Sequence, residues 1–505
     1  MLIVVRKIQT RHGLDFRDYL TSFREFTPGS SIPLWLLTLF LALLAGCNVP
    51  PLPTLTPTTQ APEATHTPTK ATPTSTTTPT VTPQPTSAIG VNPTSLAGIT
   101  LTFWHPWSGD AGDAIQASIE EFNATNNFGI RVENQYQGNF NSLYERIDGI
   151  ENSSDLPNLT VAADYKILNW ISIGKPVTSL TTYIHDPIWG YGEDEFADFY
   201  PHFLEQKSNG QNWYGFPAVR SAPLIYYNTS WARELGFSTP PATPEDFKEQ
   251  ACAAAQALRS NQLAEDDGSG GWLINTSPSA ILSWIYAFGG EILQPEGNGY
   301  RFNTPQTERT FQFLKDLFDE GCAWELPGSP EEIEFANRKA LLITASLANL
   351  DDQAAEFNRA SSADEWTVIG FPTPQGNPVI TINGPSYAIF AGKPEENLAT
   401  WLLIQWLSSP EQQANFIKAQ GTYPTRKSVS GQLDTYAREN VQWAVAQGLL
   451  DNAHTEPGLE SWDVVRWVVA DVGTQLFRYY FTPDRIPITL ELMDETAAEL
   501  HNFRD

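Results

Sequence analysis

Apolar residues recur along the chain in short runs that switch between the period of a strand and that of a helix. Residues 98–104 are rich in β-branched residues and end in aromatic ones, which predicts a strand. Residues 110–123 space apolar side chains at helical intervals, and residues 129–136 alternate as a second strand. Residues 159–163 form a short apolar run typical of a buried parallel strand. This order favours an α/β fold with a parallel sheet.

The same pattern continues through the rest of the chain. Further strands are predicted over 222–228, 272–274, 339–344, 366–371 and 379–390, the last interrupted by Asn383-Gly384-Pro385. Further helices are predicted over 245–259, 280–288, 307–320, 394–407 and 410–419, and the stretch from 430 to 503 is mostly helical. Thr243 followed by Pro244 is a typical start for the helix over 245–259.

The N-terminus has the pattern of an export signal. Residues 34–45 are apolar except for Thr38, follow a positively charged segment, and are too short for a bilayer span of about 20 residues. The run ends in Leu44-Ala45-Gly46-Cys47, which resembles a bacterial lipobox. The resemblance implies that residues 1–46 are a lipoprotein-type signal peptide and that Cys47 is lipidated. The alternative is a short membrane anchor with an incidental cysteine.

Residues 48–95 have the composition of a tether. They contain 11 Pro and 16 Thr, and Glu63 and Lys70 are the only charged residues. Such a segment lacks apolar area to bury, so we expect 47–96 to be a lipidated Cys and a disordered tether. In polyproline II conformation, at about 3.1 Å per residue, it reaches roughly 150 Å. The alternative is an O-glycosylated stalk of a eukaryotic surface protein.

Composition excludes several classes of function. The chain has 58 acidic and 30 basic residues, a net charge of −28, which argues against nucleic-acid binding. Three cysteines and scattered histidines fit neither a four-cysteine zinc module nor a paired metal site. No phosphate loop and no Gly-x-Ser-x-Gly motif is present. We therefore expect no metal, no cofactor and no nucleic-acid partner.

The order of motifs after residue 97 resembles a known family. The motifs are 99–107, Tyr214-Gly215-Phe216-Pro217, Tyr226-Tyr227-Asn228, 234–247, Gly289-Gly290, 335–340, Phe371-Pro372-Thr373-Pro374 and Ser408-Ser409-Pro410-Glu411-Gln412-Gln413. In this order they resemble the maltose-binding-like extracellular solute-binding proteins (family 1). The resemblance implies an α/β, two-lobe periplasmic-binding-protein-like fold of type II for residues 97–505. It places lobe one at 97–219 and 378–408, and lobe two at 220–377 and 409–505, joined by hinge crossings.

The resemblance also implies a function. It predicts a monomeric receptor on the outer face of the bacterial cytoplasmic membrane, held there by a lipid anchor alone. The receptor binds a sugar or oligosaccharide between its lobes and delivers it to the permease subunits of an ABC importer, without catalysis. One alternative is a receptor for a polyamine, glycerophosphodiester or peptide. Another is an anchored glycoside hydrolase, which needs two carboxylates across a cleft.

Candidate solute contacts combine aromatic planes for sugar faces with polar groups for hydroxyl rims. Those carried over from the family or placed at strand ends are His105, Trp107, Ser108, Asp164, Tyr165, Arg220, Ser221, Asn275, Ser277, Ser279, Trp284, Ser346, Asn349, Asn383, Gly384, Trp443 and Trp462. Arg220 stands where the family's maltose receptors have a carboxylate, and no Trp follows the strand over 339–344. Both departures argue against a maltose-type ligand.

Cys252 and Cys322 are the cysteines that remain after lipidation of Cys47. Both lie on or beside predicted helices of lobe two, in an oxidising compartment, so we expect a disulfide between them. Two buried free thiols are the alternative.

Overall fold

The first of two five-stranded sheets is built around the parallel strands β1 (Thr100–His105), β2 (Arg131–Tyr136) and β3 (Leu159–Ala163). The computed structural model describes residues 86–204, 212–326 and 330–502. β1 lies between β2 and β3 and runs parallel to both. β11 (Pro385–Ile389) pairs with β3 in antiparallel orientation, and β4 (Phe216–Pro217) pairs with β11. The sheet order is β2-β1-β3-β11-β4.

The second sheet repeats this topology with other parts of the chain. Its strands β7 (Ala323–Trp324), β6 (Gly270–Leu273), β8 (Ala340–Ser346) and β9 (Trp366–Ile369) run in one direction. β5 (Pro223–Asn228), which lies between β8 and β9, runs antiparallel to both. Its order is β7-β6-β8-β5-β9. The parallel arrangement predicted from the sequence is therefore right for four strands of each sheet and wrong for one, β11 in the first sheet and β5 in the second.

The chain path explains the antiparallel strands. β5 and β11 are the first strands that the chain enters after crossing from the other sheet, at residues 220–221 and 383–384 respectively. No crossover helix precedes either strand, and only a parallel connection needs such a helix. The single run predicted over 379–390 is accordingly split into β10 (Ile380–Ile382), which pairs with β12 (Ala453–Thr455), and β11.

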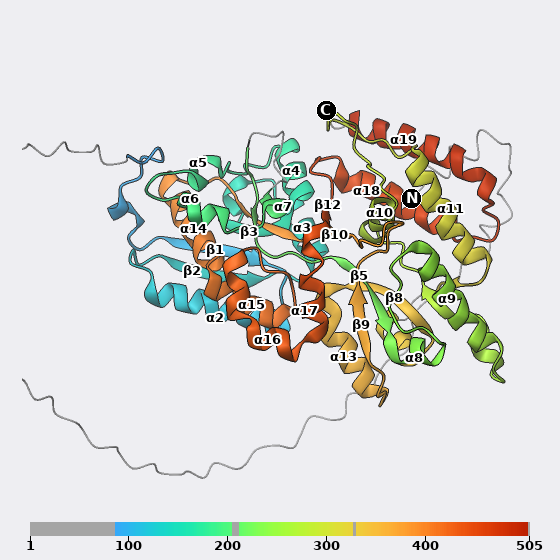
Figure 1. The fold of residues 1–505 in the computed structure, drawn as a ribbon. Helices are drawn as coiled ribbons and strands as arrows, with labels where there is room; N and C mark the ends of the chain where they lie inside the picture. Colours follow the sequence, from blue (N-terminus) through green and yellow to red (C-terminus); the bar gives the residue numbers. More distant parts are fainter. Residues whose placement is uncertain (1–85, 205–211, 327–329, 503–505) are drawn as a thin grey trace, which may run out of the picture. The chain divides into compact units, whose positions relative to one another are not determined.

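Helices surround both sheets (Figure 1). Those between β1 and β4 are α2 (Gly109–Thr125), α3 (Phe140–Asp148), α4 (Asp164–Ser172), α5 (Thr181–Ile184), α6 (Glu193–Ala197) and α7 (Pro201–Leu204). Those between β5 and β9 are α8 (Thr229–Glu234), α9 (Pro244–Arg259), α10 (Pro278–Ala287), α11 (Pro305–Asp319), α12 (Glu331–Ala336) and α13 (Leu350–Arg359). Those after β11 are α14 (Pro394–Leu407), α15 (Pro410–Gln420), α16 (Asp434–Glu439), α17 (Val441–Gln447), α18 (Trp462–Leu476) and α19 (Ile486–Asn502).

Separate hydrophobic cores define two lobes. The first lobe is the first sheet with a core that includes Phe103, Trp170 and Trp401. The second lobe is the second sheet with two neighbouring cores, one of which contains Trp272 and the apolar faces of α18 and α19. α15 packs against both lobes, because Phe416 belongs to the first core while neighbouring residues of the helix belong to the second lobe. The lobe boundaries drawn from the sequence stay a prediction.

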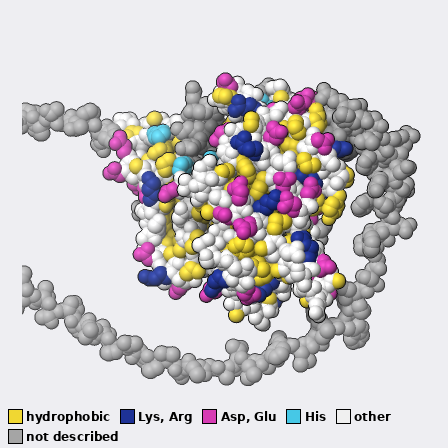
Figure 2. Space-filling model, turned by 45° about the vertical axis from the view of Figure 1, so that its right-hand side comes forward, with side chains coloured by type: hydrophobic (Ala, Val, Ile, Leu, Met, Phe, Trp, Pro, Cys, Tyr) yellow, Lys and Arg dark blue, Asp and Glu magenta, His cyan; other side chains and the backbone are white. Residues whose placement is uncertain are grey.

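Two local predictions are confirmed in the second lobe. The Thr243 hydroxyl accepts a hydrogen bond from the Asp246 backbone N–H, and the Asp246 carboxylate accepts one from the Thr243 N–H, which caps α9. Cys252 and Cys322 form a disulfide that links α9 to the segment after α11. Acidic and basic side chains are interspersed on the face shown in Figure 2.

Residues 86–96, which composition places in the tether, lie against the first lobe. The Asp186 carboxylate accepts hydrogen bonds from the Ser87 hydroxyl and the Ala88 N–H, both at 2.8 Å. Leu96 is fully buried in the first core. The predicted signal peptide, Cys47 and the tether up to residue 85 lie outside the described residues. None of the helices in the described ranges is both long and apolar enough to cross a membrane.

Candidate functional site

Three segments meet where the chain passes between the lobes. Arg220 forms an antiparallel bridge to Tyr423, and Ser221 forms one to Asn383. Gly384 follows with φ = 140°, and a Cβ there would lie 2.5 Å from the Val219 carbonyl oxygen. A side chain at this position would therefore separate two of the crossing segments, so the hinge requires glycine.

A buried ion pair lies beside this hinge. The Arg220 guanidinium is 3.4 Å from the Asp164 carboxylate and donates hydrogen bonds to the Ser386 hydroxyl (3.0 Å) and the Pro385 carbonyl (2.7 Å). Burial raises the pKa of Asp164, and the Arg220 charge opposes that shift. Burial also lowers the pKa of Arg220. Because each charge neutralises the other, the pair holds the crossings together and leaves no free charge for a solute.

The N-terminal turn of α4 and the first turns of α18 bring the two lobes into contact. The Arg466 guanidinium lies over the Tyr165 ring, 4.7 Å from its centroid, and donates a hydrogen bond to the Tyr165 hydroxyl. The Lys166 ammonium is 2.9 Å from the Asp148 carboxylate and 3.7 Å from that of Asp463. We call Asp148, Tyr165, Lys166, Glu456, Asp463 and Arg466 the interlobe cluster.

Glu456 supports the cluster from the second lobe. It is 4% exposed and accepts hydrogen bonds from the Ser279 hydroxyl and, at 2.9 Å, from the Trp462 indole N–H. Its carboxylate is 3.7 Å from the Arg466 guanidinium. Burial raises the pKa of Glu456 and lowers the pKa of Arg466 to about 10. The guanidinium remains charged at neutral pH, held between an aromatic ring and an acid.

Each of the three cations that the described residues place between the lobes has an acidic partner. Lys166 faces Asp148 and Asp463, Arg466 faces Glu456, and Arg220 faces Asp164. A buried charge without a partner is strongly destabilising, so a site with excess charge would favour a solute of opposite sign. The three cations face four acids, so these pairs leave no cation free for an anion. Together with the Tyr165 ring and several hydroxyl groups, they fit a neutral polar molecule better.

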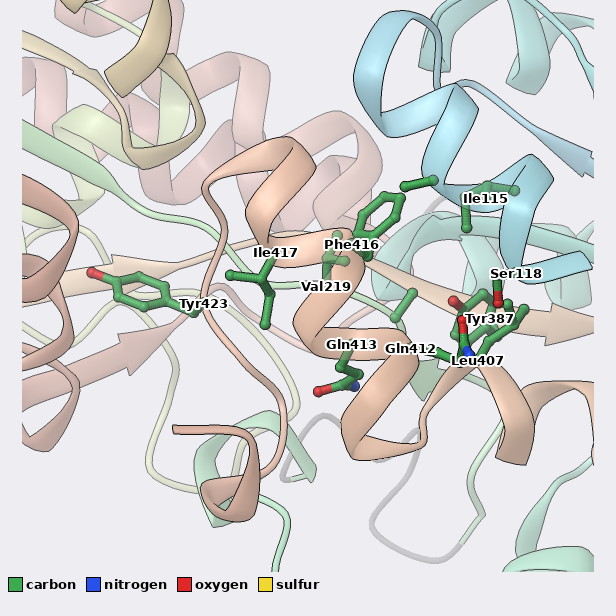
Figure 3. A pocket seen from close by; sticks show the side chains of 12 residues that line it. Ile115, Ser118, Val219, Tyr387, Leu407, Gln412, Gln413, Phe416, Ile417 and Tyr423 are labelled. Carbon is green, nitrogen blue, oxygen red and sulfur yellow. The ribbon is translucent and has the colours of Figure 1, made fainter. Parts of the chain in front are cut away.

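Two cavities adjoin the crossings and the second sheet. One has a volume of about 10 Å³ and lies between α2 and α15, lined by Ser118, Val219, Tyr387 and Phe416 among others (Figure 3). The other has a volume of about 60 Å³ and lies at the carboxyl ends of β6 and β8. Sites that enclose a small molecule typically have roughly 300–1,000 Å³. The residues of the interlobe cluster are thus in contact with one another. A solute of sugar size would fit between them only if the two lobes moved apart.

The aromatic residues proposed from the sequence are buried. Their exposed fractions are 3% for His105, 4% for Trp107, 0% for Trp284, 2% for Trp443 and 0% for Trp462. His105 and Trp107 stack on each other, with ring centroids 5.9 Å apart. Tyr165 is the proposed aromatic residue that remains half-exposed and lies between the lobes. Contact of the five buried rings with a solute stays a prediction.

The proposed polar residues fall into distinct environments. Asp164, Arg220, Ser221, Asn383 and Gly384 belong to the hinge, where the Ser221 hydroxyl also lies 2.9 Å from that of Ser346. Ser279 belongs to the interlobe cluster through Glu456, and Asn275 lines the larger cavity. Asn349 donates to Glu332, whereas Ser108 and Ser277 are exposed at the starts of α2 and α10.

Sequence reasoning missed most of the interlobe cluster. Asp148, Lys166, Glu456, Asp463 and Arg466 were not among the candidates. One signal was present: Arg466 interrupts an otherwise apolar stretch of α18, Val464-Val465-Arg466-Trp467-Val468-Val469. A single charge within an apolar helical stretch indicates a charge held at a buried contact, because an unpaired one would be too costly there.

Comparison with known proteins agrees with this geometry. The family of bacterial extracellular solute-binding proteins matches residues 117–441. A binding protein of Brucella abortus (strain 2308) is 24% identical over 313 residues, which are 60% of this chain and 72% of the relative.

Solved structures with the same fold include two whose solutes differ. The cyclic α-maltosyl-1,6-maltose binding protein of Arthrobacter globiformis has a TM-score of 0.67 at 18% identity, over 81% of this chain and 100% of its own. UgpB of Mycobacterium tuberculosis, solved in complex with glycerophosphocholine, has a TM-score of 0.63 at 19% identity. The match covers 80% of this chain and 99% of UgpB. At these identities the likeness shows the fold alone, and it confirms the predicted type II periplasmic-binding-protein-like architecture.

Proposed function

Because the chain belongs to the bacterial extracellular solute-binding protein family, we propose that it is the receptor of an ABC importer for a neutral sugar or oligosaccharide. The observation that carries the choice of solute is the pairing of every cation between the lobes with an acid. A phosphodiester would need a spare cation, and a polyamine would need spare acids. The described residues of this contact offer no spare cation and only one acid more than they have cations, which is too few for a polyamine, whereas a neutral solute needs neither.

The same residues suggest how the solute is held. Tyr165 offers an aromatic face to the C–H surface of a sugar ring, and Arg466, Asp463 and Lys166 offer donors and acceptors to its hydroxyl groups. These groups satisfy one another in the closed arrangement, so a solute replaces contacts that already exist. Its differential affinity for the open and closed arrangements then sets the population of each.

Location follows partly from the family. Members are extracytoplasmic, and we extend this to a lipid anchor at Cys47 with a Thr/Pro-rich tether, on the strength of the sequence pattern at residues 34–95. Two acyl chains on the cysteine would suffice for stable attachment, and the permease would meet the closed receptor at the membrane.

Calorimetric titration and thermal unfolding of the full-length protein in detergent test the solute class. The panel contains neutral mono- and oligosaccharides, sugar acids, glycerophosphodiesters and polyamines. A neutral sugar at 100 times its dissociation constant should stabilise the fold by about 2.7 kcal/mol. Stabilisation by charged solutes alone, or by none of the panel, would refute the proposal, and release of reducing ends from a glycoside would point to the hydrolase.

Tyr165→Ala sharpens this test, with Tyr136→Ala as the matched control. Tyr165 lies under Arg466 between the lobes, whereas Tyr136 is 56% exposed at the end of β2. We expect Tyr165→Ala to weaken sugar binding about tenfold, since an aromatic contact and a hydrogen bond are lost together. Tyr136→Ala should bind as the unmodified protein does.

A further inference from the structure

A polar cavity at the carboxyl edge of the second sheet is not used by the interlobe cluster. It is lined by Leu273, Ile274, Asn275, Leu326, Glu331 and Thr344 and has a volume of about 60 Å³. That is several times the roughly 10–15 Å³ that one water molecule requires. The cavity is therefore large enough for a small polar group of a solute, such as a hydroxymethyl arm.

Glu331 provides the cavity with an acceptor that the protein does not use. The residue is half-buried at the start of α12, and no ion pair to it occurs within the described ranges. Burial raises its pKa. Asn275, in contrast, is fully engaged: its amide donates to the Thr344 carbonyl at 2.9 Å, and its oxygen accepts from the Ser277 N–H at 2.9 Å. The free hydrogen-bonding capacity of the cavity thus resides in the Glu331 carboxylate.

A tryptophan accompanies this carboxylate. Trp324 on β7 is in register with Leu273 on β6, so their side chains emerge on the same face of the sheet. Its indole N–H is buried and has no acceptor among the described residues. A carboxylate in the cavity and an unpartnered indole on the same face of the sheet as Leu273 are suited to a solute that carries hydroxyl groups and apolar C–H faces.

The positions of the cavity and of the interlobe cluster along α18 set a minimum length for a solute that reaches both. The Thr474 hydroxyl of α18 donates to that of Thr276 at 3.1 Å, next to Asn275 in the cavity wall. Arg466 precedes Thr474 by eight residues on the same helix. At 1.5 Å per residue, the two positions are about 12 Å apart along the helix axis.

We propose that this cavity is a second subsite for the solute, in which Glu331 accepts hydrogen bonds from the hydroxyl groups at one end of an oligosaccharide. The proposal rests on the proposed function and deepens it. A solute that reaches from Arg466 to the cavity wall beside Thr474 must extend over about 12 Å along α18, which a single sugar ring does not. The geometry therefore points to a solute of at least two rings.

Glu331→Gln in the full-length protein tests the subsite, with Glu334→Gln as the matched control. Both residues lie on α12 and lose the same charge, but Glu334 does not line the cavity. We expect Glu331→Gln to weaken the best-binding oligosaccharide of the panel about tenfold, as for the loss of a hydrogen bond to a charged group. Binding of a monosaccharide should be unchanged, and Glu334→Gln should leave both affinities unchanged.

Leu326→Phe provides a test that does not alter charge. Leu326 lines the cavity, and the larger phenylalanine side chain should narrow it, so oligosaccharide binding should fall while monosaccharide binding persists. Equal oligosaccharide affinity in both variants and the unmodified protein would overturn the subsite and leave the proposed function intact. A polyamine that competes for the cavity and depends on Glu331 would also overturn it. Failure of every sugar to bind the unmodified protein would overturn both proposals.

Discussion

The two sheets share one topology but differ at their carboxyl ends. In both, the fourth strand in the sheet order runs antiparallel to the other four. In the first sheet this edge is filled by the stacked rings of His105 and Trp107 and by the Asp164–Arg220 pair. In the second sheet it retains a polar cavity with an acid, Glu331, that forms no ion pair with any residue the structure describes. The same strand order therefore supplies a rigid hinge on one side and room for a solute group on the other.

Stability is also distributed differently between the lobes. The second lobe is crosslinked by Cys252 and Cys322, which are 70 residues apart in the sequence. The first lobe depends at its edge on a buried ion pair and on a histidine whose burial lowers its pKa to about 4. The comparison predicts that loss of a charged side chain or acidic pH destabilises the first lobe. Reduction of the disulfide should instead destabilise the second lobe.

The largest effect is expected from removing one partner of the buried pair. Asp164→Ala leaves the Arg220 charge, which is 2% exposed, without its acid and should lower the free energy of unfolding by about 3–5 kcal/mol. Glu365→Ala is the control, since its partner Arg233 and Glu365 itself are both exposed and such pairs contribute about 1 kcal/mol or less. Urea unfolding measures both, and equal losses would show that the edge of the first sheet is not held by this pair.

Removal of the disulfide should have a slightly smaller effect, confined to the second lobe. In the chain-entropy description, opening a loop of this length costs up to about 4 kcal/mol. Cys252→Ala with Cys322→Ala should therefore unfold at lower urea and be insensitive to a reducing agent, whereas the unmodified protein should be destabilised by it. If the two proteins unfold at the same urea concentration, the crosslink does not stabilise the second lobe.

Acid should destabilise the first lobe through His105. The pKa of His105 is lowered from 6.5 to about 4 by burial. Between these pH values the imidazole is protonated in the unfolded chain and neutral in the folded one. The contribution of neutral His105 to the free energy of unfolding is fully present above pH 6.5. It falls by up to about 3 kcal/mol as the pH drops to 4. His105→Gln should flatten this part of the stability profile. An unchanged slope in the variant would place the acid sensitivity elsewhere.

Much of the fold was predictable because local patterns agree with it. The run over 159–163 coincides with β3, and the helix predicted over 394–407 coincides with α14. Helix starts were also predictable from single residues, such as Thr243-Pro244 at the start of α9. The antiparallel strands were not predictable, since residues 379–390 read as one apolar run and give no sign that the two halves join different sheets.

The candidate site was predicted less completely than the fold. The ends of β1 and β3 led to Asp164 and Tyr165, which do lie between the lobes. The same reasoning selected Trp284 and Trp462, which are buried, because aromatic residues are equally typical of a core and of a sugar site. Arg466 and Glu331 were missed, as each is one of many charged residues until its neighbours are known.

The sequence by itself predicted an export signal, and it determined the tether composition, the order of strands and helices, and the pairing of the two cysteines. These properties depend on residues close together in the chain, or on there being a single possible partner. Only the tertiary structure decided which charges neutralise one another, which aromatic rings are buried and where a cavity remains. Those properties arise from segments hundreds of residues apart, such as Tyr165 and Arg466, that meet only when both lobes have folded.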